Sequence, residues 1–111
     1  MIPLVFTEDG SGRIGDGIRQ PSYVDYLKLV ADAGVTLAVP AGAKHVLFSP
    51  ATAVDFFIRY TSATLTSAVY AGSVVDGTAL EQNPKLRSLK GVSGLGIISP
   101  DGGDLTLSWF G

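Results

Sequence analysis

Apolar residues occupy both faces of two segments that alternate like β-strands. One face of the segment 54–60 is fully apolar and consists of Val54, Phe56, Ile58 and Tyr60. The opposite face places Phe57 between Asp55 and Arg59. In the segment 105–110, Phe110 likewise lies opposite Leu105, Leu107 and Trp109. Alternation of this kind predicts strands with one face on a core. Large apolar residues on the other face indicate a surface for another protein.

Composition supports a small globular domain that associates with other proteins. The chain has 111 residues, of which 46% are hydrophobic and 16% are charged, against roughly 25% charged in an average soluble domain. It has no cysteine, which excludes disulfides and thiolate metal sites. A net charge of −2 gives no electrostatic basis for binding nucleic acid or an anionic membrane. We expect no membrane span, no secretory signal and no cofactor.

Frequent turn signals divide the chain into many short strands. Fourteen glycines and six prolines favour turns over long helices. Strands are predicted at 2–6, 23–30, 35–39, 45–49, 53–60, 73–75, 78–80, 87–89, 95–99 and 104–110. The segment 23–30 also fits a helix that runs to Ala33, although its valines and aromatics favour a strand. The segment 61–72 is interpreted as a loop or an irregular strand. This spacing predicts an all-β, antiparallel β-sandwich over residues 23–111.

The first 22 residues have a different composition and are predicted to form an arm with a short strand at 2–6. Glycines crowd residues 7–17, and Gly10, Gly12 and Gly15 have the G-x-G-x-x-G spacing of dinucleotide-binding loops. The residues after them, 16–21, end in Pro21 and cannot form the helix that such a site needs. The segment is therefore interpreted as a flexible arm that orders against a partner. Its expected partner-binding residues are Gly10, Gly12, Arg13 and Ile14.

Residues that could carry catalysis or bind metal lack the surrounding pattern that such chemistry needs. His45 is the single histidine, and no G-x-S-x-G elbow is present to position a nucleophile. Asp101 and Asp104 flank two glycines, a spacing that a hairpin turn explains better than a calcium loop. The two glutamates, Glu8 and Glu81, both lie in predicted loops. The sequence therefore predicts a protein that is not an enzyme.

The aromatic residues divide into core residues and candidate contact residues. Most of them are expected to fill the core, as aromatics do in small domains. Phe57 and Phe110 are the exceptions, because alternation places them opposite the main apolar face. Arg59 shares the face of Phe57. We therefore predict that Phe57, Arg59 and Phe110 contact a partner or a second copy of the chain.

Turns and strand ends between residues 35 and 110 resemble those of a known group of proteins. The residues that carry the resemblance are Val39–Val46, Val54–Tyr60, Asp76–Ala79, Asn83–Pro84, Ile98–Gly103 and Leu105–Phe110. In these segments the chain resembles the decoration proteins, also called cement or staple proteins, of tailed-phage capsids. The resemblance covers about three-quarters of the chain and excludes the first 22 residues.

The resemblance implies a jelly-roll-like sandwich on the outer surface of a bacteriophage virion. Such a protein would be a homodimer that contacts several major capsid protein subunits and stabilises the shell against internal genome pressure. No catalytic residue is implied. The implied fold is also similar to carbohydrate-binding modules, so a glycan-binding module on the virion surface is the alternative function.

Overall fold

The computed structural model describes residues 1–4, 6–8, 14–18 and 20–111. Nearly all of its regular structure is β-strand, in agreement with the all-β prediction. The strands are β1 (Phe6–Glu8), β2 (Ile14–Ile18), β3 (Tyr23–Leu29), β4 (Val35–Ala38), β5 (His45–Pro50), β6 (Phe57–Arg59), β7 (Glu81–Gln82), β8 (Leu86–Ser88), β9 (Gly94–Ile98) and β10 (Gly103–Phe110). One short 3-10 helix, η1 (Ser67–Tyr70), lies between β6 and β7.

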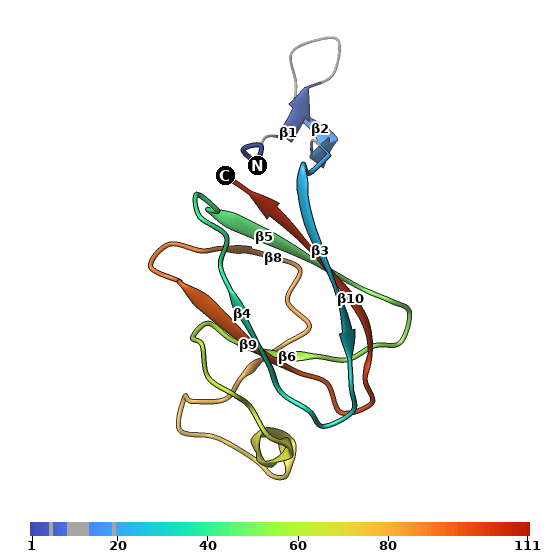
Figure 1. The fold of residues 1–111 in the computed structure, drawn as a ribbon, viewed down its shortest axis with the longest axis vertical. Coiled ribbons are helices and arrows are strands. Elements are labelled where there is room, and N and C mark those ends of the chain that lie inside the picture. Colours follow the sequence, from blue (N-terminus) through green and yellow to red (C-terminus); the bar gives the residue numbers. More distant parts are fainter. Residues whose placement is uncertain (5, 9–13, 19) are drawn as a thin grey trace.

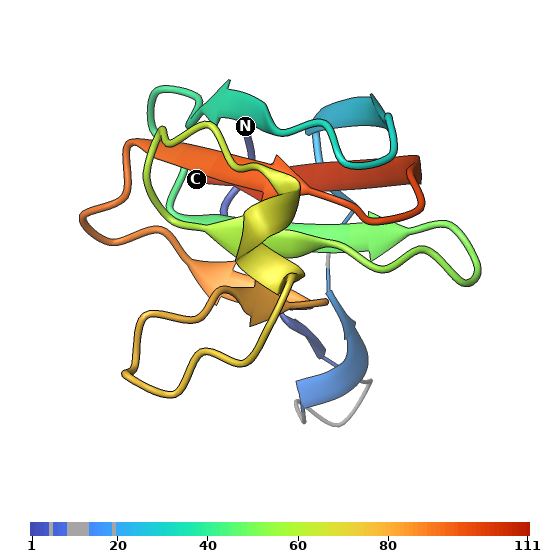
Figure 2. The ribbon, with the colours of Figure 1, turned by 90° about the horizontal axis from the view of Figure 1, so that it is seen from below.

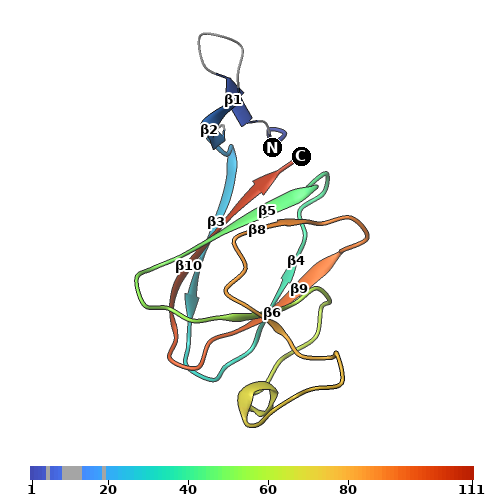
Figure 3. The ribbon, with the colours of Figure 1, turned by 180° about the vertical axis from the view of Figure 1, so that it is seen from behind.

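Two antiparallel four-stranded sheets form the body of the molecule, as Figures 1 and 3 show from opposite sides. The first sheet has the order β3-β10-β5-β8, and the second has the order β4-β9-β6-β7. Strand β10 is central in the first sheet and pairs with β3 over seven residues and with β5 over six. The N-terminal strands β1 and β2 pair only with each other and project beyond one end of the body (Figure 1).

The hydrophobic core lies between the two sheets. The first sheet contributes alternate residues of β10, among them Leu107 and Trp109, and the second sheet contributes Leu95 and Ile97 of β9. All four of these side chains have no exposed surface. Packing of this kind from both inner faces is the arrangement of a β-sandwich. Of the four inward residues predicted for the segment 54–60, Phe56 and Ile58 belong to this core and Tyr60 packs against it, whereas Val54 is only partly buried.

Several strand predictions are confirmed. The segment 23–30 forms a strand rather than a helix, and strands also form in the segments predicted at 35–39, 45–49, 87–89, 95–99 and 104–110. The segment predicted at 53–60 is a strand only at Phe57–Arg59. The segment 61–72 is a loop that contains η1.

Other strand predictions were wrong. Residues 73–80 contain no strand, because the Asp76 carboxylate accepts hydrogen bonds from the backbone and hydroxyl of Thr78 and stabilises a local turn instead. Near the N-terminus, residues 1–4 have no regular structure and the strand begins at Phe6. Ile14–Ile18, predicted as loop, is a strand that pairs with Phe6–Glu8.

Candidate interaction surface

Phe57 lies on the outer face of the second sheet, as predicted, but the chain's own loop covers it. Its side chain is half-buried, and its ring centroid lies 5.4 Å from that of Tyr70 in η1. The Tyr70 hydroxyl in turn donates a hydrogen bond to the Asp32 carboxylate, which holds η1 against the body. Figure 2 looks along the molecule from the end that carries η1. The prediction that Phe57 is left open for a partner therefore needs correction.

Glycines on β9 explain why this loop can lie so close to the sheet. Gly94 and Gly96 alternate with the core residues of β9, so both face outward. A Cβ atom on Gly96 would lie 2.4 Å from the carbonyl oxygen of Ala63, and one on Gly94 would lie 1.8 Å from the Ser62 hydroxyl. Leu65, in the same loop, is 4% exposed. The outer face of the second sheet is therefore a second packed layer made by the chain itself.

Phe110 was also wrongly predicted as a surface residue, because its side chain has no exposed surface. It ends the central strand β10 at the point where the N-terminal residues return to the body. The N–H of Gly111 donates a hydrogen bond of 2.7 Å to the Ile2 carbonyl, and the Lys44 N–H donates one of 2.7 Å to the Phe110 carbonyl. Phe110 is buried because β10 is an interior strand of its sheet and because the N-terminal residues lie beside the end of this strand.

The other predicted contact residues are placed as follows. Arg59 ends β6 with an exposed side chain. Ile14 is the first residue of β2. Gly10, Gly12 and Arg13 lie outside the described residues.

Open apolar surface instead lies on β3, the edge strand of the first sheet. Val24 is 50% exposed and Tyr26 is 57% exposed, and both point away from the core. Val30, just after the strand, is 67% exposed. These three residues are here named the β3 strip. A row of exposed apolar side chains on an edge strand is a typical site of protein association.

Sequence reasoning missed this strip. The alternation of Val24, Tyr26, Lys28 and Val30 is visible in the sequence, but the helical alternative obscured which residues face outward. Leu29 is the signal that identifies the outer face. It is buried in the core, so the odd-numbered residues of β3 face inward and the even-numbered residues face outward.

A second exposed apolar site lies in the loop between η1 and β7. Val74 is 42% exposed and Val75 is 94% exposed, beside the turn at Asp76 and Gly77. Residues 73–78 are here named the loop tip. Figures 1 and 3 place this loop at one end of the molecule and the β1–β2 hairpin at the other. The longest dimension of the molecule is 50 Å, so these two elements are well separated.

Polar contacts close the side of the sandwich opposite β3. Arg87 on β8 of the first sheet forms an ion pair with Glu81 on β7 of the second, with 2.9 Å between Nε and Oε1. The Tyr60 hydroxyl donates a 2.5 Å hydrogen bond to the same carboxylate. Hydrogen bonds from Arg87 lower the pKa of Glu81, while burial and the Glu81 contact raise the pKa of Tyr60 above its ordinary value. This cluster links the two sheets and has the geometry of a structural contact.

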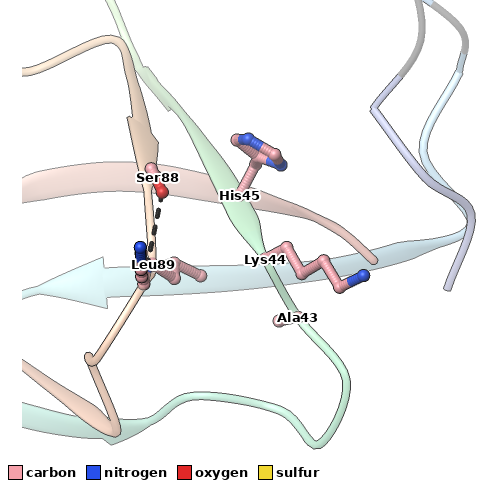
Figure 4. Close-up of a pocket in the computed structure, with 6 residues that line it drawn as sticks. Ala43, Lys44, His45, Ser88 and Leu89 are labelled. Carbon is pink, nitrogen blue, oxygen red and sulfur yellow. Dashed lines mark hydrogen bonds between the residues drawn. The ribbon is translucent and has the colours of Figure 1, made fainter.

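A hollow of about 400 Å³ lies at the ends of β5 and β8 (Figure 4). Its lining residues are Ala43, Lys44, His45, Ser88, Leu89 and Lys90. None of these six described residues is acidic, whereas a carboxylate orients the histidine of a catalytic triad. The Ser88 hydroxyl accepts a hydrogen bond of 3.4 Å from the Lys90 backbone N–H. Ser88 lies directly opposite His45 in the pairing of β5 with β8, and the structure shows no hydrogen bond between these two side chains.

Metal and membrane sites were also sought among the described residues. Within that part of the chain, histidine and carboxylate side chains form no group of three or more that could hold a metal ion. None of the described helices has the length and hydrophobicity needed to cross a membrane. Comparison of the chain with protein-family models, curated proteins and solved structures found no match.

Proposed function

We propose that this chain is a structural virion protein that decorates the outer surface of an assembled tailed-phage capsid. In this proposal it has no enzymatic activity and bridges neighbouring major capsid protein subunits. The observation that carries the proposal is the presence of open apolar surface in two separate places, the β3 strip and the loop tip. Two such sites on a chain with few charges suit a protein that joins other proteins.

The elongated shape supports a division of roles between these surfaces. The loop tip and the β1–β2 hairpin lie at opposite ends of a 50 Å molecule and would contact different capsid subunits. The β3 strip lies along the side of the body and would mediate self-association into a homodimer. A dimer would make twice as many capsid contacts as a single copy of the chain. Gly10, Gly12, Arg13 and Ile14 would belong to the capsid-contacting arm.

We further propose that the sandwich is a jelly roll. The strand orders β3-β10-β5-β8 and β4-β9-β6-β7 support this assignment. The chain passes from one sheet to the other at every connection between β3 and β10 except that from β6 to β7. Jelly rolls have eight strands in two sheets and contain two Greek keys.

The proposed mechanism is stabilisation by selective binding. A protein that binds the assembled lattice but not free subunits stabilises the lattice by RT ln(1 + [L]/Kd), about 2.7 kcal/mol at a hundredfold excess over Kd. Repetition at many sites would resist the internal pressure of the packaged genome. The protein would be made in the host cytoplasm and reside on the outer capsid surface.

Co-sedimentation tests the proposal. Purified chain is mixed with expanded shells that lack decoration and, separately, with monomeric coat subunits. We expect it to sediment with shells and not to bind free subunits. Val75→Ser should reduce shell occupancy, whereas Ala51→Ser, at an exposed residue of the β5–β6 loop, should not. Absence of the wild-type chain from the shell pellet would refute the proposal.

A carbohydrate-binding module is the second candidate, because Tyr26 presents an exposed ring beside a carboxylate. Asp104 on the neighbouring strand β10 is a diagonal neighbour of Tyr26 and raises the pKa of its hydroxyl. An exposed aromatic ring flanked by hydrogen-bonding groups is a common platform for a sugar. A glycan array separates the two candidates, because shell binding without any glycan signal favours the capsid proposal.

A further inference from the structure

The free edge of β3 is long, regular and open. Seven consecutive residues, Tyr23 to Leu29, pair with β10 without a bulge, and among the described strands only β10 pairs with β3. Leu27 faces inward yet is only half-buried, although its cross-strand partner Leu105 has no exposed surface. The difference shows that nothing in the described chain covers the open side of β3.

Edge strands of monomeric proteins usually carry features that prevent pairing with another strand. These features include bulges, prolines, outward-facing charges (lysine above all) and inward-pointing charges. Between Tyr23 and Val30 the outward residues are Val24, Tyr26, Lys28 and Val30, so only one carries a charge. The inward charge, Asp25, is already engaged by the Trp109 indole. With no bulge and no proline, this edge keeps one outward lysine as its main obstacle to pairing with another strand.

We propose that β3 pairs antiparallel with β3 of a second copy of this chain. A two-fold axis perpendicular to the first sheet would join the two first sheets into one continuous eight-stranded sheet. The inference rests on the self-association included in the proposed function, and it names the strand and the register.

Side-chain complementarity selects the register. With Leu27 opposite Leu27 of the second copy, Val24 lies opposite Val30 and Tyr26 lies opposite Lys28 on the outer face. This arrangement pairs apolar with apolar side chains and sets a cation beside an aromatic ring. A register centred on Tyr26 would instead oppose Val24 and Lys28. We therefore assign the register centred on Leu27.

The contact area sets the expected strength of the dimer. A seven-residue strand pair with its flanking side chains buries less than the roughly 800 Å² per partner of a standard stable interface. We expect a dissociation constant on the order of micromolar. Binding to a shell would raise the local concentration of the chain and favour the dimer there.

Sedimentation equilibrium of the full chain without shells tests the dimer. Tyr26→Lys would place one lysine opposite Lys28 of the other copy at each of the two symmetric positions and should weaken dimerisation roughly tenfold. Val75→Lys makes the same change of charge at a 94% exposed valine outside β3 and should leave dimerisation unchanged. Circular dichroism checks that both variants fold. If Tyr26→Lys does not fold, Val24→Lys is measured instead and should also weaken dimerisation.

Cysteine cross-linking tests the register, because the natural chain has no cysteine. Leu27→Cys should form an intermolecular disulfide under mild oxidation, since directly opposite residues lie about 4.5–5.5 Å apart. Tyr26→Cys should not, because the two cysteines would be diagonal neighbours about 7–8 Å apart.

Three results would overturn the inference: a wild-type monomer at every concentration, a dimer that Tyr26→Lys leaves intact, or faster cross-linking by Tyr26→Cys than by Leu27→Cys. These outcomes are independent of capsid binding. A monomer that binds shells would refute only the β3 pairing, whereas a dimer that ignores shells would refute only the capsid role.

Discussion

The indole N–H of Trp109 donates a 2.9 Å hydrogen bond to the carboxylate of Asp25. Trp109 has no exposed surface and lies on the central strand β10, whereas Asp25 lies on the edge strand β3. The bond satisfies a buried donor and fixes the edge strand to the core. This contact therefore adds to the seven-residue pairing with β10 that positions the β3 strip.

Removal of the acceptor should destabilise the fold. Asp25→Ala would leave the buried indole N–H without its partner, and we expect a loss of about 1–3 kcal/mol in the free energy of unfolding. Asp25→Asn keeps an acceptor oxygen and should lose less. Urea denaturation followed by the fluorescence of Trp109, the single tryptophan, measures both changes. Equal stability of Asp25→Ala and wild type would contradict the role assigned to this bond.

A methyl group on Gly96 should disturb the loop that covers the second sheet. The added Cβ would meet the Ala63 carbonyl oxygen at 2.4 Å, and overpacking of this kind costs about 1–3 kcal/mol. Gly72→Ala is the matched control, because its Cβ would meet no atom within 4 Å, and it should change stability by no more than about 0.5 kcal/mol. Thermal unfolding of the two variants compares them directly. An unaffected Gly96→Ala would show that the loop does not pack on β9.

The substitution Phe110→Ala should lower the free energy of unfolding by about 3–5 kcal/mol, as expected for loss of a large side chain from a packed interior. This is a substantial part of the 5–15 kcal/mol typical of a whole domain. Phe110→Leu should lose less, because it keeps most of the apolar volume. Chemical denaturation measures both variants. A near-neutral Phe110→Ala would restore the interpretation of Phe110 as a surface contact.

The sequence predicts the inward faces well because burial leaves a period of two. Leu105, Leu107 and Trp109 were predicted on the core side of their strand, and all have no exposed surface. The same alternation cannot tell whether an apolar residue on the outer face meets a partner or another part of the same chain. Phe57 and Phe110 were misassigned for this reason.

One sequence signal could have indicated that the second sheet is covered. Gly94 and Gly96 occupy one face of a strand whose other face is apolar, and glycine in a strand often marks the close approach of another backbone. The approaching segment, 62–65, is about 30 residues earlier in the chain, and no local pattern links the two. Contacts that distant follow from tertiary packing.

The ion pair between Glu81 and Arg87 should make stability depend on pH in the acidic range. Arg87 lowers the pKa of Glu81 in the folded protein below its ordinary value of 4.5. The contribution of the ionised carboxylate is therefore complete above pH 4.5 and is lost as the pH falls through the lowered pKa. We expect Glu81→Gln to lower the melting temperature at pH 7. The difference in melting temperature between the variant and wild type should disappear once the pH falls below the lowered pKa of Glu81. A difference that stays constant from pH 7 into the acidic range would contradict the ion-pair assignment.

Amide hydrogen exchange with and without expanded phage shells tests most directly whether the open apolar surface is a protein contact. We predict slower exchange in the loop tip, residues 73–78, and in the β1–β2 hairpin when shells are in excess. Exchange in the 62–65 segment, which already packs on the second sheet, should stay unchanged. Identical exchange at the loop tip and the hairpin with and without shells would contradict the account.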